Sequence, residues 1–217
     1  MRKSSTPTLK LTDKNVHEAA QQVADFLRRG YAIIFPTDTV YGLGVDALNK
    51  SAVERLIALK RRPSNKPIPL FVESIEMAHE VAFIDARQEE ILKKLWPGPF
   101  TFVLEKKDKL GGAVSAGTST VGLRIPQNDF CQALLKEFAG PITASSANIS
   151  SEQPLATITE IVEQFKVHSA SPDFIVDAGP LEGNPCTVID IRSEKARILR
   201  MKTTPAAMKS IFEAGIQ

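Results

Sequence analysis

The sequence predicts an α/β fold in which helices cover a mixed β-sheet. Apolar runs of strand length alternate with helical patterns along the chain, as in proteins whose helices pack on a central sheet. Several successive strands have no helix between them, which favours a mixed sheet over a purely parallel one. The 217 residues include 43% hydrophobic side chains, enough to fill one sizeable core. We therefore expect a loose lead-in over residues 1–12 and a single domain over residues 13–217.

Helical patterns in the first half of the chain begin at capping residues and end at helix breakers. Asn15 with Glu18, and Ser51 with Glu54, have the spacing of N-terminal capping pairs. Pro63 stops the second of these helices. The expected elements are, in order, a strand near 9–11, a helix at 15–30, a strand at 31–35, a helix at 51–60, a strand at 68–72, and helices at 74–81 and 85–95.

The second half of the chain is richer in strands. A rigid turn at 96–99 precedes them, and the polar, glycine-bearing segment 106–118 is expected to be a mobile loop and a candidate lid. Thr157 and Glu160 again have the spacing of a capping pair. The expected elements are strands at 100–105, 121–125, 142–145, 174–177, 186–191 and 196–200, and helices at 129–138, 157–165 and 205–212.

Composition excludes several classes of protein. A net charge of +2 is too small to indicate nucleic-acid binding by bulk charge. Cys131 and Cys186 are far apart, and His17, His79 and His168 have no cysteine or histidine at ligand spacing, so we expect no zinc site. The polar N-terminus is unlike a signal peptide, and no apolar run is long enough to span a membrane. We expect a reduced, cytosolic protein without membrane contact.

Positive charge is concentrated in one short stretch. Lys60, Arg61, Arg62 and Lys66 lie within seven residues, between the end of a predicted helix and a predicted strand. Cations on a proline-stiffened loop are suited to hold an anion in a fixed position. Cations in the last turn of a helix are also favoured by the helix dipole whatever the function, so this stretch alone leaves a solvated surface as the alternative.

Two uncharged loops offer hydrogen bonds beside predicted strands. The loop PTDTVYGLG at 36–44 follows the apolar strand 31–35, a position where α/β sheets tend to bind ligands. The segment 145–151 carries five hydroxyl or amide side chains. Taken singly, each loop also fits an ordinary turn. Arg124 lies amid apolar residues, so it is expected to face solvent, a carboxylate or a ligand.

No nucleophile or standard nucleotide motif accompanies these loops. The chain has no G-x-S-x-G elbow, no P-loop and no G-x-G-x-x-G after a strand. Cations on separate segments remain, together with neutral hydrogen-bonding loops. This inventory suits a polyanion in a cleft, and phosphoryl or nucleotidyl transfer, which requires positioning and charge stabilisation and no covalent residue. The cations concerned are Lys60, Arg62, Lys66, Arg124 and Arg200.

Six segments resemble the YrdC/Sua5 family, the L-threonylcarbamoyladenylate synthases. They occur in the family's order over nearly the whole chain: PTDTVYGLG at 36–44, KRRP with a following KP at 60–67, WPGPFTFVL at 96–104, TVGLRIP at 120–126, SSANIS at 145–150, and DAGPLEGNPCTVIDI at 177–191 with ILR at 198–200. The resemblance implies a YrdC-like single domain, a twisted mixed sheet and a large basic cleft.

The resemblance also implies a reaction. The amine of L-threonine takes up bicarbonate or CO2, and the resulting carbamate attacks the α-phosphate of ATP and releases pyrophosphate. The product, threonylcarbamoyl-AMP, passes to a threonylcarbamoyl transferase complex that modifies tRNA. Mg2+ would accompany ATP, held mainly by the phosphates because no carboxylate pair marks a site for it. Weak RNA binding is a further expectation.

The family's signature residues map onto this chain by position. The Lys-x-Arg and Ser-x-Asn signature falls on Lys60, Arg62, Ser146 and Asn148, which the resemblance assigns to phosphate, nucleotide and the transferred carboxyl group. The threonine side of the site corresponds to Thr37, Arg124 and Cys186. Further nucleotide contacts correspond to Lys66, Thr120 and Arg200.

Some positions depart from the family pattern and put fine substrate contacts in question. Cys186 replaces a serine expected near the threonine, Ser151 replaces a glycine, and Phe71 replaces a histidine that the Sua5 branch often has. Met201 and Lys202 replace a Pro-Gly pair. Two alternatives remain open: a paralogue that binds nucleotide or RNA without making the adenylate, and a carbamoyl-transfer module of the hydrogenase-maturation type. The second occurs in much longer chains with zinc-finger parts, and this chain has no cysteine motif.

Overall fold

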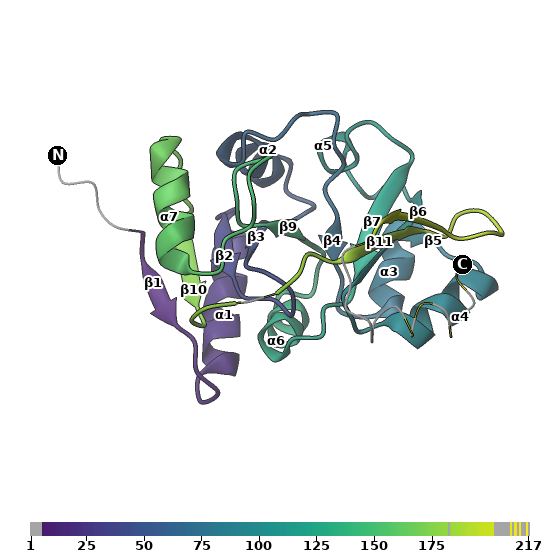
Figure 1. Cartoon of the computed structure of the whole chain (residues 1–217), viewed down its shortest axis with the longest axis horizontal. Helices are drawn as coiled ribbons and strands as arrows, with labels where there is room; N and C mark the ends of the chain where they lie inside the picture. Colours follow the sequence, from purple (N-terminus) through teal and green to yellow (C-terminus); the bar gives the residue numbers. More distant parts are fainter. Residues whose placement is uncertain are drawn as a thin grey trace.

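Two mixed β-sheets flanked by helices form the fold in the computed structural model of the chain. The structure describes residues 6–181, 183–201, 209, 211, 213 and 216. The smaller sheet, with α1 and α7, lies at the left in Figure 1, and the larger sheet, with α3 and α4, lies at the right. The predicted α/β fold with mixed pairing is therefore confirmed, but the strands divide between two sheets instead of forming one.

The smaller sheet contains five strands in the order β1-β10-β2-β3-β9. β1 and β2 both pair with β10 in parallel, and β3 pairs antiparallel with β2 and β9. β1 lies inside the expected lead-in, at the edge of this sheet. The strands are β1 (Thr8–Lys10), β10 (Phe174–Asp177), β2 (Ile33–Phe35), β3 (Gly42–Gly44) and β9 (Ser145–Ser146).

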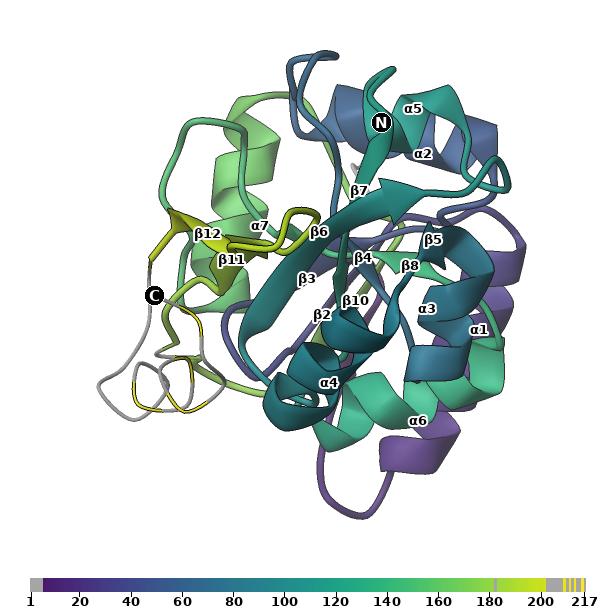
Figure 2. The ribbon, with the colours of Figure 1, turned by 90° about the vertical axis from the view of Figure 1, so that its right-hand side faces the viewer.

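The larger sheet follows the order β12-β11-β6-β7-β4-β8, and β5 pairs with β6 off this path. β11 with β6 and β4 with β7 are parallel, and the other pairs are antiparallel. In Figure 2, β6, β7 and β11 of this sheet face the viewer. The strands are β12 (Arg197–Arg200), β11 (Thr187–Asp190), β6 (Phe100–Lys106), β7 (Thr120–Arg124), β4 (Leu70–Phe71), β8 (Ile142–Thr143) and β5 (Ala82–Phe83).

The division between the sheets explains the error in the predicted strand 142–145. β8 pairs with β4 in the larger sheet, whereas β9 pairs with β3 in the smaller one. Ala144 lies between them, and its backbone N–H donates to Pro69 O at 2.7 Å. The chain therefore passes from one sheet to the other at this residue, and the segment predicted as one strand contributes to both sheets.

Two apolar cores lie on opposite faces of β2. Ile33 and Phe35 belong to a core with α1 and α6, while Ile34 belongs to the larger core, as the alternation of strand side chains requires. The helices are α1 (Val16–Arg28), α2 (Lys50–Leu59), α3 (Ile75–Val81), α4 (Ala86–Leu95), α5 (Gly112–Ser115), α6 (Asp129–Phe138) and α7 (Ile158–Val167). The predicted closing helix falls mostly outside the described residues. None of the described helices is long and apolar enough to cross a membrane.

One predicted capping pair is confirmed, one is wrong, and in the third the capping residue is correct but makes no side-chain hydrogen bond to its helix. Thr157 and Glu160 form the reciprocal capping box at the start of α7. At α2, however, Asn49 caps the helix by accepting from Ala52 N at 3.2 Å, so Ser51 already lies inside it. At α1, Asn15 is the capping residue by position, but its side chain accepts from Thr12 N at 2.7 Å instead of from the helix.

The segment 106–118 differs from the expected mobile lid. It contains α5, and its side chains Leu110, Val114 and Ser115 are buried. Val114 O accepts from Ile68 N at 2.8 Å, which joins the segment to the chain just before β4. No residue of the segment is among those that line the main cavity described below. The burial of these three side chains was not predicted, because the segment as a whole has a polar composition.

Candidate functional site

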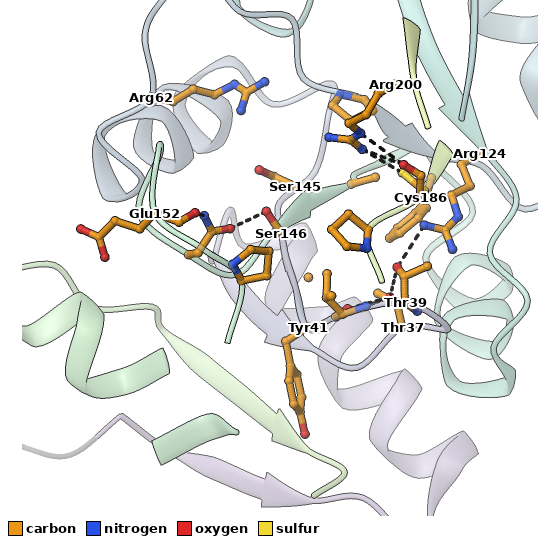
Figure 3. Close-up of a pocket in the computed structure, with 18 residues that line it drawn as sticks. Thr37, Thr39, Tyr41, Arg62, Arg124, Ser145, Ser146, Glu152, Cys186 and Arg200 are labelled. Atoms are coloured by element: carbon orange, nitrogen blue, oxygen red, sulfur yellow. Dashed lines mark hydrogen bonds between the residues drawn. The ribbon is translucent and has the colours of Figure 1, made fainter. Parts of the chain in front are cut away.

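A cavity of about 280 Å³ lies where the two sheets meet. The loop before β3 and strand β9 supply one wall, and the ends of β4, β7, β11 and β12 supply the other. Figure 3 shows these side chains converging from segments that are far apart in the sequence. The residues at the cavity include Thr37, Thr39, Tyr41, Arg62, Phe71, Arg124, Ser146, Asn148, Glu152, Cys186 and Arg200.

A second cavity, of about 380 Å³, adjoins the first. Arg62, Pro69 and Arg200 line both, so the two form one cleft with arginines at the junction. Thr120 lies in the second cavity and not in the first. Thr37 and Arg124, which the resemblance assigns to threonine, line the first cavity, and Thr120, which it assigns to the nucleotide, lines the second.

The turn before β3 is organised by the hydroxyl of Thr37. Its oxygen accepts from Thr39 N at 3.0 Å and from Val40 N at 3.2 Å, and its hydrogen goes to Val40 O at 2.7 Å. Because that single hydrogen is used, the 3.0 Å contact between the two threonine hydroxyls must be donated by Thr39. The Thr39 oxygen is then free to accept, and it accepts from Arg124 at 3.2 Å.

Arg124 lies at the inner end of the cavity with a carboxylate partner. Its guanidinium group is 2.6 Å from Asp38 Oδ1 and also donates to Gly98 O at 3.0 Å. The side chain is only 3% exposed and lies 5.6 Å from the centre of the Phe71 ring. A buried arginine without such a partner would be costly. Of the three predicted surroundings of Arg124, which were solvent, a carboxylate and a ligand, the structure confirms the carboxylate.

Cys186 and Arg200 form the rim of the cavity beside β11. Arg200 donates to Cys186 O at 3.0 and 3.2 Å, and its NH2 group lies 3.3 Å from Cys186 Sγ. The same sulfur lies 3.1 Å from Thr101 Oγ1. The Cys186 thiol, which stands where the resemblance leads us to expect a serine, therefore has two polar neighbours, Thr101 and Arg200.

Lys60 is buried behind the cavity wall. Its ammonium group donates to the backbone oxygens of Ser146 and of Asn148, the latter at 2.6 Å, and its own carbonyl accepts from Ser150 N at 2.8 Å. The side chain is 2% exposed, and burial lowers its pKa to about 7, with a smaller effect of the Arg62 charge. Lys60 is not among the lining residues, so in this structure it holds the loop 146–150 in place.

The signature pair Ser146 and Asn148 is joined by a direct hydrogen bond. The Ser146 hydroxyl donates to Asn148 Oδ1, and the Asn148 amide nitrogen donates to Ile149 O and Glu152 O at 2.8 Å each. Both residues line the cavity, as predicted from the sequence. Ser151, the departure from glycine, has a φ of 76°, a left-handed conformation that glycine adopts at less cost.

The side chains of the basic stretch have different surroundings. Arg62 reaches the cavity, and its guanidinium group donates to Pro67 O at 2.6 Å and Lys66 O at 3.2 Å. Arg61 instead donates to His168 O at 3.3 Å and lines neither cavity. Lys66 is exposed and is absent from the residues that line either cavity. Of the four cations in the basic stretch, the structure therefore brings Arg62 into the cleft.

Sequence reasoning missed three residues of the site. Asp38 is the partner of Arg124, and Thr39 links that arginine to the turn. Glu152 is the acidic side chain among the described residues that line the cavity, and its carboxylate is 2.9 Å from His168 Nε2. The apolar neighbours of Arg124 in the sequence predict that it is buried, and a buried arginine implies a carboxylate partner. No spacing rule identifies that partner as Asp38, however, because Asp38 is distant from Arg124 along the chain.

Known proteins resemble this chain in both sequence and structure. A curated threonylcarbamoyl-AMP synthase of Pyrococcus abyssi is 34% identical over 193 residues, which are 86% of this chain and 56% of that protein. A putative threonylcarbamoyl-AMP synthase of Methanocaldococcus jannaschii is 30% identical over 87% of this chain and 89% of its own length. The chain thus spans only about half of the Pyrococcus relative.

Solved structures agree with these sequence matches. The structure of Pyrococcus abyssi Sua5 complexed with L-threonine has a TM-score of 0.86 and 30% identity, over 97% of this chain and 61% of that one. Escherichia coli YciO has a TM-score of 0.80 over 95% of this chain at 23% identity, which shows the fold alone. The Sua5/YciO/YrdC family model, described as "Telomere recombination", matches residues 25–201. Because this family model matches most of the chain, including the residues that line the cleft, the protein belongs to the Sua5/YciO/YrdC family.

Proposed function

We propose that this chain is an L-threonylcarbamoyladenylate synthase, a nucleotidyltransferase. The observation that carries the proposal is a cleft with a buried arginine at its inner end, two arginines further out, and the uncharged loop of Ser146 and Asn148 between them. Such a cleft suits one ligand with a carboxylate and another with several phosphates. The names of the curated relatives and the threonine complex of the Pyrococcus neighbour support the same assignment.

The inner end of the cavity is the proposed threonine site. The amino-acid carboxylate would bind Arg124, and Thr37, Phe71 and Cys186 would bound the side chain. The neutral amine adds to CO2 with loss of a proton, or to bicarbonate with loss of water, and either route yields a carbamate. A carbamate oxygen then attacks the α-phosphorus of ATP, and the bond from that phosphorus to the pyrophosphate oxygen breaks.

The arginines at the junction of the two cavities are the proposed phosphate site. Arg62 and Arg200 line both cavities, so a triphosphate there could span them. Positioned cations stabilise charge that develops in a transition state without any proton transfer. We assign Ser146 and Asn148 to the nucleotide and the transferred carboxyl group, Lys66 and Thr120 to outer nucleotide contacts, and Lys60 to the support of the loop.

Mg2+ would enter the site with ATP. The described residues contain no group of three or more acidic, histidine or cysteine side chains suited to a metal ion. Glu152 lines the cavity, but a single carboxylate suits an ion that keeps most of its bonds to phosphate and water. In this proposal Mg2+ neutralises phosphate charge, and the chain itself contributes orientation through its arginines.

The proposed product is a mixed anhydride that must be consumed by a second enzyme. We propose that a threonylcarbamoyl transferase complex accepts it and modifies tRNA. For that role we expect a cytoplasmic protein with weak RNA affinity. A non-catalytic RNA-binding paralogue is the alternative, and it would show salt-sensitive RNA binding that ATP does not alter.

Pyrophosphate release by the purified chain tests the proposed function. With ATP and Mg2+ present, we expect release only when both L-threonine and bicarbonate are added, and much slower release with L-serine. Omission of either substrate is the control. Release that does not depend on threonine, or RNA binding without any release, would contradict the synthase assignment.

Replacement of Arg62 by alanine tests the proposed phosphate site. We expect Arg62→Ala to lower kcat/KM for ATP by about 10²- to 10³-fold, because a positioned cation is removed from the developing phosphate charge. Its thermal unfolding should change little, because the hydrogen bonds that Arg62 donates within the described residues go to carbonyl oxygens of its own loop. Arg61→Ala is the matched control, since Arg61 lines neither cavity. Equal rates for the two variants would exclude Arg62 from the site.

A further inference from the structure

The ion pair of Arg124 and Asp38 leaves part of the guanidinium group available. A guanidinium group has five N–H donors. The hydrogen bonds of Arg124 use Nε for Gly98, one N–H of NH1 for Thr39 and one of NH2 for Asp38. Within the part of the chain that the structure describes, three of the five donors are therefore engaged, and each terminal nitrogen keeps one N–H. Because Arg124 lines the cavity, these two can serve a ligand carboxylate.

The charge of the pair matters as much as its hydrogen bonds. Asp38 is 2.6 Å from Arg124, with side chains only 11% and 3% exposed, so water screens the two charges weakly. Asp38 is not itself among the lining residues. A ligand at the inner end of the cavity therefore touches Arg124 but experiences the field of both charges, which nearly cancel.

A nearly neutral pair distinguishes ligands by their net charge. The binding of a carboxylate without an amine is strengthened by attraction to Arg124 and weakened by repulsion from Asp38. A zwitterionic amino acid makes the same carboxylate contact, while its ammonium group is attracted by Asp38 and offsets that repulsion. The pair thus favours a neutral zwitterion over an anion of the same shape, which an unpaired arginine would not do.

We propose that Asp38 is a positioning residue that sets the ligand selectivity of this site, by making it accept zwitterionic amino acids and reject simple carboxylates. The inference rests on the proposed function for the identity of the amino acid. It goes beyond that function in assigning a role to a residue that acts through Arg124. Selectivity of this kind would keep abundant small organic acids out of the cavity.

Binding without ATP tests the proposal separately from catalysis. L-Threonine and 3-hydroxybutyrate, which is threonine without its amine, are titrated calorimetrically into the full chain. We expect the wild-type protein to bind 3-hydroxybutyrate at least about tenfold more weakly than threonine. Equal affinities in the wild-type protein would overturn the proposal, and this comparison requires no variant to fold.

Asp38→Asn keeps an oxygen that can accept from Arg124 and removes the charge. We expect the affinity for 3-hydroxybutyrate to rise by about 10- to 100-fold, while that for threonine changes less than about threefold because its two charges feel opposite effects. Asp173→Asn is the matched control: Asp173 pairs with Arg55 at 2.5 Å, outside the cavity lining, and its loss should leave the selectivity unchanged.

The outcomes separate this proposal from the proposed function. If the variant binds both ligands with unchanged selectivity, while the wild-type protein releases pyrophosphate with threonine, the role of Asp38 is excluded and the synthase assignment stands. If the wild-type protein does not bind threonine at millimolar concentration, both are overturned. A gain confined to the anionic ligand supports the proposal, since a purely structural role of Asp38 would weaken both ligands together.

Discussion

Lys60→Met is expected to lower turnover by about 10²-fold or more. Methionine has a similar length and no donor, so the backbone oxygens of Ser146 and Asn148 lose their partner. A buried acceptor left unpaired costs about 1–3 kcal/mol, and each 1.4 kcal/mol corresponds to about tenfold in rate if the loop must return to its place for each turnover. The measurement is pyrophosphate release at saturating substrate.

Global stability should respond to Lys60→Met less than activity does. The substitution also removes an ammonium group from a site where its charge is poorly solvated, and that gain offsets part of the lost hydrogen bonding. Lys50→Met is the matched control, since Lys50 lies at the start of the same helix with its side chain 83% exposed. Full activity of Lys60→Met would show that turnover does not depend on the support that Lys60 gives to the loop 146–150.

The lowered pKa of Lys60 predicts that the free energy of unfolding depends on pH. Its pKa is about 7 in the folded protein, against an ordinary value of 10.5. Below pH 7 both states hold the proton, so Lys60 adds no pH dependence there. Between about pH 7 and 10.5 only the unfolded state holds it, so the free energy of unfolding should rise by about 1.4 kcal/mol per pH unit.

The difference between wild type and Lys60→Met isolates this contribution from other titrating groups. Urea unfolding at several pH values gives the free energy of unfolding of each protein. The difference between the two free energies should be constant below pH 7 and should increase above it in favour of the wild-type protein. The neutral amine that forms above pH 7 still has two N–H donors for the two carbonyl oxygens. A flat difference across this range would show that Lys60 keeps its ordinary pKa and its access to water.

The elements of the fold were predictable where local patterns decide them. β10 matches its prediction residue for residue, and α6 does so as well, because both have clear apolar periodicity and defined ends. β3 was missed because its glycines read as a turn, although pairing on both sides makes it a strand. The division into two sheets was missed because it depends on which distant strands β8 and β9 meet.

The site was predictable in its composition but not in its pairing. Arg62, Ser146 and Asn148 were identified from sequence and do line the cavity. The orientation of Lys60 was not predictable, because a cation at a helix end is usually solvated and its two carbonyl partners lie 86 and 88 residues away. The link between Asp38 and Arg124, 86 residues apart, likewise arises only when the two sheets meet.

Gly183→Ala is expected to lower kcat/KM for threonine by about 10²-fold with little change in thermal stability. A Cβ atom at Gly183 would overlap the carbonyl oxygen of Thr39, so the loop that ends at Cys186 could not pass the turn before β3 as it does now. That loop is tied at its other end, where the Tyr41 hydroxyl donates to Gly179 O at 2.6 Å. A displacement of about 1 Å at a substrate-positioning group is enough for such a loss.

The expected stability of this variant follows from the exposure of Gly183. Substitutions at exposed loop positions usually change the free energy of unfolding by no more than about 0.5 kcal/mol. Gly183 is exposed and belongs to neither core, although Leu181 of the same loop packs against the larger one. Gly112→Ala is the control, because a Cβ there meets nothing within 4 Å. If Gly183→Ala retained full activity, the close passage of the loop over Thr39 would be unnecessary for the cavity. A loss of activity with an unchanged unfolding curve would instead establish that this passage shapes the threonine side of the site.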